Sequence, residues 1–141
     1  MADHVAHSAV VPPGASKPIG RYSPAVRVPF GPDHWMVFVS GQVASDSEGR
    51  LVGGEDPGKQ AEAVFARLQA VLRASGGDLH HLVSVTIFLR DLAHFQAVSA
   101  VRNLVLGEVP PASTLVEVSA LAEPGRLVEI NGIAVVPRDG E

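Results

Sequence analysis

The chain has 141 residues and a formal net charge of −4; 46% of its residues are hydrophobic and 18% are charged. This composition suits one domain with a packed core and excludes a disordered chain, while an acidic balance without a basic run argues against nucleic acid as the main partner. There is no cysteine, which excludes disulfides, thiolate metal ligands and cysteine nucleophiles.

The N-terminal segment is rich in Pro, Gly and Ser and predicts an irregular arm over residues 1–15, with a short strand at HSAVV (7–11). It has no basic stretch followed by a long apolar run, so a signal peptide is not expected. No apolar run approaches the ~20 residues that cross a bilayer. We therefore expect a single cytoplasmic domain over residues 1–141, with no membrane partner.

Two strands are predicted next, over 23–30 and 34–41, because the turn signal GPD separates two apolar runs. A loop follows, with a two-residue strand near Leu51. Residues 56–75 then repeat apolar side chains at i, i+3, i+4 and i+7, which predicts an amphipathic helix. Asp56 suits its N-cap, Pro57 its first position and Gly76 its end.

Alternating apolar residues predict a strand over about 82–90, and a second helix is expected at roughly 92–106, ended by Gly107. The last two strands are predicted at about 113–119 and 127–136. This order indicates an α+β fold, a mixed sheet with two helices on one face. Several strands are apolar on both sides, so a partner subunit is the simplest cover for the other face.

Known catalytic motifs of serine hydrolases, zinc proteases and nucleotide-binding proteins are absent from the sequence. The six histidines lack the spacing of metal ligands. His80 and His81 are adjacent, and neighbouring side chains of an extended segment point apart. We therefore expect structural or solvated histidines and no metal site.

Two glutamates lie inside apolar strands, Glu117 in TLVEVS and Glu129 in LVEING. A carboxylate in such a place is costly unless it is paired, hydrogen-bonded or functional. Strand alternation places Ser113 and Leu115 on the face of Glu117, and Asn131 on the face of Glu129. Either these faces are partly wet or paired with arginine across a subunit boundary, or a carboxylate holds water as a general base in a cleft.

Tyr22 and Gly41 are two further candidates. Tyr22, the only tyrosine, lies in PIGRYSPAV and either packs with its hydroxyl on a backbone group or lines a site. Gly41 ends a predicted buried strand, where it either opens a bulge or lets a ligand approach the backbone.

The sequence resembles the Rid family, the reactive intermediate deaminases known as RidA. The resemblance covers about residues 16–136 and is carried by the segments PIGRYSPAV, FVSGQV, VTIFLRDLAHFQAVSAV, PPASTLVEV and LVEINGIAV. It implies a chorismate-mutase-like α+β fold and a barrel-like homotrimer with a cleft at each interface. It also implies hydrolysis of small enamines and imines, such as 2-aminoacrylate, to 2-keto acids and ammonia, without cofactor or metal.

Position by position, the resemblance implies Glu129 and Tyr22 as catalytic residues, with Glu129 positioning water. The arginine that binds the substrate carboxylate in the family falls on Ser113. Leu115 stands where the family often has cysteine, and Asn131 replaces a second acid. The implied substrate-binding residues are Gly41, Ser113, Leu115, Asn131 and Phe88.

A serine hydroxyl cannot replace the bidentate bond between a guanidinium and a carboxylate. Loss of a charged partner in a partly desolvated cleft costs about 2–5 kcal/mol. We therefore expect a less anionic, or a larger and more apolar, enamine or imine as substrate, with Ser113 and Asn131 bonding neutral groups. Alternatively, Arg21 or an arginine across the interface supplies the charge.

Three functions stay open from the sequence. The first is hydrolytic deamination or tautomerisation of an enamine or imine, and the second is a non-catalytic small-molecule-binding or chaperone-like trimer. Ribonuclease activity, sometimes ascribed to relatives, is the least favoured because the acidic chain lacks a basic groove.

Overall fold

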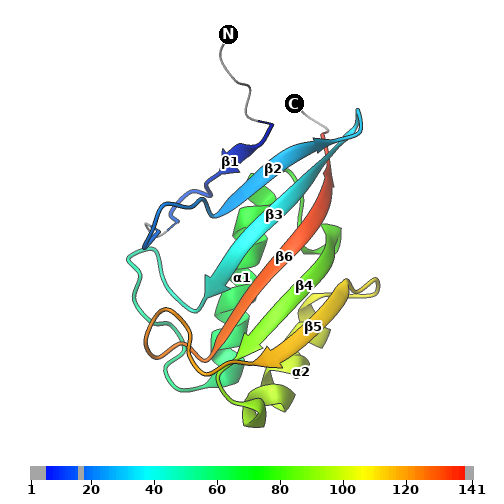
Figure 1. Ribbon diagram of the computed structural model, residues 1–141. Coiled ribbons are helices and arrows are strands. Elements are labelled where there is room, and N and C mark those ends of the chain that lie inside the picture. Colours follow the sequence, from blue (N-terminus) through cyan, green and yellow to red (C-terminus); the bar gives the residue numbers. More distant parts are fainter. Residues whose placement is uncertain (1–5, 16–17, 139–141) are drawn as a thin grey trace.

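A twisted sheet with both long helices on one face forms the domain (Figure 1). The computed structural model describes residues 6–15 and 18–138, so residues 1–5 of the predicted arm lie outside the described residues. The helices are α1 (Pro57–Ala74) and α2 (Phe95–Val105), and short 3-10 turns cover Leu79–His81 and Leu92–His94. The strands are β1 (Ser8–Val10), β2 (Ala25–Phe30), β3 (His34–Val43), β4 (Leu82–Leu89), β5 (Ala112–Glu117) and β6 (Val128–Pro137).

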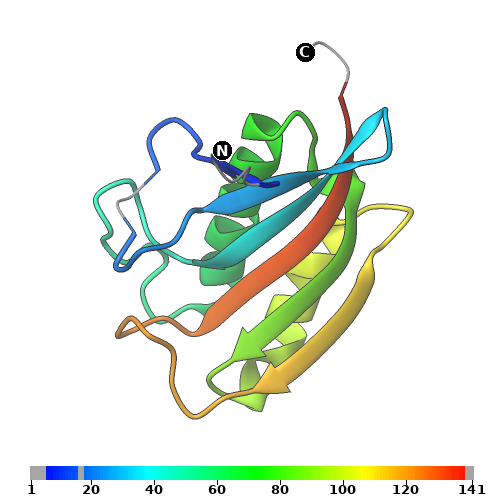
Figure 2. The same cartoon turned by 45° about the horizontal axis from the view of Figure 1, so that its top comes forward.

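The six described strands lie in the order β1-β2-β3-β6-β4-β5. Only β4 and β5 pair in parallel, and α2 makes the crossover between them, while the other neighbours are antiparallel. The predicted mixed sheet with two helices on one face is therefore confirmed. Figure 2 shows both helices behind the same side of the sheet. No helix in the described part of the chain has the length and hydropathy to cross a bilayer.

Helix α1 begins and ends as its sequence predicts. The Asp56 carboxylate accepts hydrogen bonds from the N–H groups of Gly58 at 3.0 Å and Lys59 at 3.1 Å. Gly76 follows the helix with a φ of +94°, a conformation that favours glycine. The predicted apolar stripe is fully buried against the sheet and consists of Ala61, Val64, Phe65, Leu68, Val71 and Leu72.

Three local predictions need correction. The second helix is shorter than predicted, because Asp91 caps a separate 3-10 turn through the Ala93 N–H before α2 starts. His80 and His81 lie in a 3-10 turn rather than an extended segment, so their rings are adjacent, with centroids 4.0 Å apart. The expected strand near Leu51 is a single bridge to Ser45.

The two faces of the sheet differ in cover. Alternate residues of β6 are buried under the helices, whereas Glu129, Asn131 and Ile133 point to the other face. No helix lies over that face in Figure 1, and Phe38 remains 39% exposed on it. We refer to it as the open face.

A fully buried glutamine fixes the place where β6 begins. The Gln60 side chain donates to the carbonyls of Gly54 at 2.6 Å and Gly125 at 3.0 Å, and accepts from the Leu127 N–H at 2.9 Å. It thus joins the start of α1 to the segment that leads into β6. Leu127 lies two residues before Glu129, so this buried amide also positions the start of the candidate site.

Replacing Gln60 with Ala should lower the free energy of unfolding by about 2–4 kcal/mol, because it leaves buried backbone groups without partners. Chemical denaturation measures the change. Gln96 is exposed on α2 and is the matched control; Gln96→Ala should change stability by less than about 0.5 kcal/mol. Equal effects of the two substitutions would contradict this role.

Candidate functional site

A bulge in β3 shapes the candidate site. The β3–β6 register shifts between Val39 and Gln42, so β3 holds one more residue than β6 over this interval. Such bulges bend a strand and redirect its side chains. Ser40 lies in the bulge and donates from its backbone to Pro24 at 2.9 Å and from its hydroxyl to Ser23 at 2.7 Å. These bonds attach the segment that carries Tyr22 to the edge of β3.

The Glu129 side chain packs against the β3 backbone at Gly41. A Cβ atom at position 41 would lie 2.8 Å from Cδ of Glu129 and closer still to Oε2. Contacts this short do not occur, so the close approach requires glycine for lack of space. The bulge interpretation of Gly41 is therefore confirmed, and the group that approaches its backbone is the Glu129 carboxylate. Approach of a ligand to Gly41 stays a prediction.

Glu129 is half-buried, and its strand neighbours are Val43 on β3 and Phe88 on β4. Burial raises the pKa of the Glu129 carboxyl above its ordinary value, and the negative charge of Glu123 raises it further. A raised pKa brings a carboxylate closer to the range in which it can accept and return protons near neutral pH. Glu129 thus has the surroundings of a general base.

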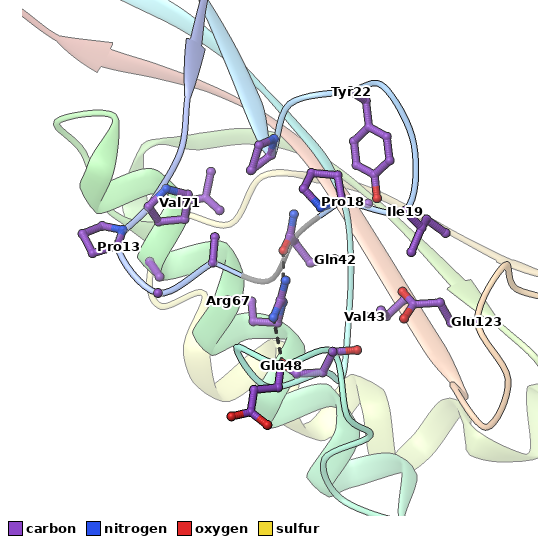
Figure 3. A pocket seen from close by; sticks show the side chains of 18 residues that line it. Pro13, Pro18, Ile19, Tyr22, Gln42, Val43, Glu48, Arg67, Val71 and Glu123 are labelled. Atoms are coloured by element: carbon purple, nitrogen blue, oxygen red, sulfur yellow. Dashed lines mark hydrogen bonds between the residues drawn. The ribbon is translucent and has the colours of Figure 1, made fainter.

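A cavity of about 390 Å³ adjoins Gly41 at this edge of the sheet. We refer to it as the arm pocket, because residues 12–15 and 18–19 form one wall, opposite β3 and α1 (Figure 3). Tyr22 and Gly41, both predicted site residues, line it together. Its other lining residues include apolar Pro13, Pro18, Ile19, Val43 and Val71 and polar Gln42, Glu48, Arg67 and Glu123.

Arg67 is a pocket residue that the sequence interpretation missed. It extends from α1 and is half-buried; Nε donates to Gln42 Oε1 at 3.2 Å and Nη1 to the Ser45 carbonyl at 2.8 Å. Burial lowers the pKa of Arg67, and the charge of Glu123 opposes that shift. A signal was present, because Arg67 follows Val64 by three residues and precedes Val71 by four, a spacing that keeps it on the inner side of the helix.

The remaining predicted residues fall into two groups. Phe88 lies directly across from Glu129, and Asn131 lies across from Thr86 in a hollow of the open face that Tyr22 also lines. Ser113 and Leu115 are opposite Val85 and Ile87, which are buried beneath the helices. Ser113 and Leu115 therefore point to the helix-covered face of the sheet, whereas Glu129 points to the open face. Their strand, β5, is two strands away from β6, which carries Glu129.

Leu115 packs against the core, whereas Ser113 is exposed on the edge strand and lines a hollow with Arg102 at the end of α2. One chain alone therefore does not bring Ser113 to Glu129. Glu117 has a local role, because its carboxylate accepts a hydrogen bond from the Leu92 N–H at 3.0 Å. Among residues 6–15 and 18–138, no group of three or more His, Asp or Glu side chains could hold a metal ion.

Comparison with known proteins identifies the family. The profile described as Endoribonuclease L-PSP matches residues 13–136. The chain belongs to this family, which is the YjgF/RidA family. Protein DfrA of Myxococcus xanthus is 44% identical over 131 residues, covering 93% of this chain and 97% of the relative. A RutC family protein of Pyrococcus abyssi is 38% identical over 121 residues, covering 85% and 90%.

The fold agrees with solved Rid structures. The crystal structure of RidA from the Antarctic bacterium Psychrobacter sp. PAMC 21119 superposes with a TM-score of 0.79 at 34% identity, covering 92% of this chain and 99% of that one. The predicted Rid fold is confirmed by this match. Membership of the Rid family supports a general role in the handling of enamine or imine metabolites.

Gly41→Ala should displace the Glu129 carboxylate, because the new methyl group would occupy its position. The side chain is flexible at its end, so the melting temperature should change by no more than about 4 °C. A crystal structure and a thermal melt measure the two effects. Gly58→Ala, whose methyl would meet its nearest neighbour at 3.4 Å, is the control and should leave Glu129 in place. An unmoved carboxylate in the Gly41 variant would refute the steric argument.

Glu129→Gln should make the protein more stable at pH 7, because the raised pKa means that the folded state disfavours the ionised carboxylate. The stability associated with Glu129 is fully present below its ordinary, unfolded pKa of 4.5 and is lost as pH rises through the higher folded pKa. The gain in the variant should therefore vanish below about pH 4. Denaturant unfolding at both pH values tests this, and a variant less stable than the wild type at pH 7 would contradict it.

Proposed function

We propose that the protein hydrolyses or tautomerises a reactive enamine or imine metabolite, with Glu129 as the general base. The observation that carries the proposal is the half-buried Glu129 carboxylate, whose pKa is raised, held against Gly41 beside a pocket. Such a group can take a proton from water and return it to a leaving amine. No step of this chemistry needs a cofactor or a metal.

The hydrolysis that we propose assigns the proton transfers to Glu129. Water adds to the carbon of a protonated C=N bond, and Glu129 accepts one proton from that water. The resulting carbinolamine receives this proton on nitrogen, and the C–N bond breaks as ammonia leaves. The hydroxyl then gives its proton to solvent, which replaces the proton that the imine took up, and a C=O group remains. The sum is one imine and one water giving one carbonyl compound and one ammonia. Tyr22, which lines the same pocket as Gly41, orients the substrate in this proposal.

The same geometry supports a homotrimer as the working unit. The open face exposes Phe38 and Val116 at 39% each, which favours cover by another subunit. Ser113 is on the edge strand β5 and faces away from Glu129 of its own chain. In our proposal each interfacial cleft combines Glu129, Gly41 and Tyr22 of one subunit with the β5 edge of its neighbour.

Ser113 then decides which substrates fit. Without a guanidinium at this position, the cleft has no bidentate partner for the carboxylate of a small 2-imino acid. We therefore propose a substrate that is less anionic next to its C=N bond, or larger and more apolar. Cytoplasmic location, expected from the sequence, stays a prediction.

A non-catalytic trimer that binds a metabolite in the same clefts is the alternative, and Ser113 is the observation that favours it. Tight binding of an enamine or imine analogue without turnover would distinguish it from the enzyme. We do not propose ribonuclease activity, despite the family description, because the chain carries a net charge of −4.

Ser113→Arg should raise kcat/KM on 2-iminobutanoate by roughly 30-fold or more, since it restores a charged partner for the carboxylate. The imine is generated in the assay by an amino acid oxidase, and release of the 2-keto acid is followed. Ser119→Arg, at an exposed position beyond β5, adds the same charge elsewhere and should change nothing.

Adding Glu129→Gln to the Ser113→Arg protein should abolish the gained activity, because the general base is then missing. Wild-type protein as fast as the Ser113→Arg variant would show that the serine is not the limiting feature. A double variant as active as the single one would refute the role of Glu129.

A further inference from the structure

Two carboxylates approach the same short stretch of β3. Glu129 packs against the backbone at Gly41 and is the strand partner of Val43. Glu123, from the loop that joins β5 to β6, lines the arm pocket together with Gly41 and Val43. Figure 3 shows the Glu123 side chain beside Val43. The fold therefore brings Glu123 close to Glu129 through neighbours that both residues share.

The buried Arg126 fixes the loop that carries Glu123. Arg126 is only 6% exposed. Its guanidinium donates to three neutral oxygens, which are the Pro124 carbonyl at 2.9 Å, the Ser45 hydroxyl at 2.7 Å and the Gly49 carbonyl at 2.8 Å. Pro124 belongs to the same loop as Glu123, whereas Ser45 and Gly49 follow β3. These bonds join the two loops, so Glu123 has a defined place beside the end of β3.

The ion pair between Arg126 and Glu123 is a long one. Nη2 of Arg126 lies 3.5 Å from Oε1 of Glu123, and this nitrogen carries two hydrogens. It already donates to oxygens of Ser45 and Gly49, so it attracts Glu123 through charge rather than through a hydrogen bond. Such a pair neutralises a carboxylate incompletely. The negative charge of Glu123 accordingly acts on further neighbours, Arg67 and Glu129.

The nearest strand neighbours of Glu129 carry no charge. They are Val43 on β3, Phe88 on β4 and Asn131 on β6. The other ionisable groups around the arm pocket come from the segment before β2, from α1 and from the loop after β3, and they are Tyr22, Arg67 and Glu48. Burial makes the larger contribution to the raised pKa of Glu129, and the charge that adds to it is that of Glu123. Glu123 is therefore the neighbour best placed to influence Glu129.

We propose that Glu123 is a positioning residue for the reaction, whose carboxylate, held by Arg126, keeps a second negative charge beside Glu129. Two neighbouring carboxylates repel each other when both are ionised, so a proton on one of them is favoured. Glu123 has the cationic partner, and the repulsion therefore favours a proton on Glu129. The inference rests on the proposed function and adds to it a residue that acts through the general base.

Glu123→Gln removes the charge and keeps the shape of the side chain. NMR titration of the Glu129 side-chain carboxyl carbon should give a lower midpoint in this variant than in the wild type, because the repulsion is gone. Glu123→Asp keeps the charge and should retain at least part of the wild-type elevation. Glu62→Gln, at an exposed position on α1, is the control and should leave the midpoint unchanged.

Salt separates an effect of charge from a change of structure. Raising NaCl from 0.1 M to 1 M shortens the Debye length from about 10 Å to about 3 Å. The difference in midpoint between the wild type and Glu123→Gln should therefore shrink. If Glu123→Gln fails to fold, the wild type alone decides, because its midpoint should fall as salt is added.

Four results would overturn the proposal. They are an unchanged midpoint in Glu123→Gln, an equal fall in Glu62→Gln, a Glu123→Asp midpoint as low as that of Glu123→Gln, and a midpoint that does not respond to salt. The last result would mean that the substitution had acted by displacing the loop.

The pH profile of catalysis distinguishes failure of this inference from failure of the proposed function. Adding Glu123→Gln to the Ser113→Arg protein should move the acidic limb of kcat/KM on 2-iminobutanoate to lower pH, because the base must be deprotonated to act. If no imine is hydrolysed but the NMR midpoint follows Glu123, the role of the charge stands and the catalytic proposal fails. If hydrolysis depends on Glu129 but neither the midpoint nor the limb follows Glu123, the reverse holds.

Discussion

The Glu129 carboxylate lies so close to the β3 backbone that only a hydrogen atom fits between them at Gly41. The bulge in β3 and the buried Gln60 amide both serve this contact, one by shaping the strand and the other by fixing where β6 begins. The contact withdraws part of the carboxylate from water, which raises its pKa. Glu117, by contrast, has a structural role, because its carboxylate accepts a hydrogen bond from the Leu92 N–H.

The division of the sheet into two faces explains why one chain holds only part of a site. Residues of β6 alternate between the helical core and the open face, so Glu129 and Asn131 come to lie where no helix covers them. The parallel pairing of β5 places Ser113 and Leu115 on the opposite face, at the edge of the sheet. A subunit interface would both cover the exposed apolar side chains of the open face, Phe38 and Val116, and bring an edge strand to Glu129. Assembly and catalysis are thus linked in the function that we propose.

Local sequence signals predicted most of the fold, because strong helical periodicity, an Asp-Pro start and glycine ends fix α1 without long-range information. A carboxylate inside an apolar strand likewise indicated Glu129. Alternation within one strand could not indicate which face of the sheet Ser113 would share, since this depends on the pairing of β5 with β4. Arg67 was missed because a pocket made by the arm, β3 and α1 joins segments far apart in the sequence. Its position near the inner side of α1 was the one local sign.

The fold keeps the Glu129 carboxylate partly desolvated and so prepares it to exchange protons near neutral pH. NMR titration of the Glu129 side-chain carboxyl carbon in the wild-type protein tests it most directly. We expect a titration midpoint above the ordinary glutamate value of 4.5. A midpoint at or below that value would contradict it.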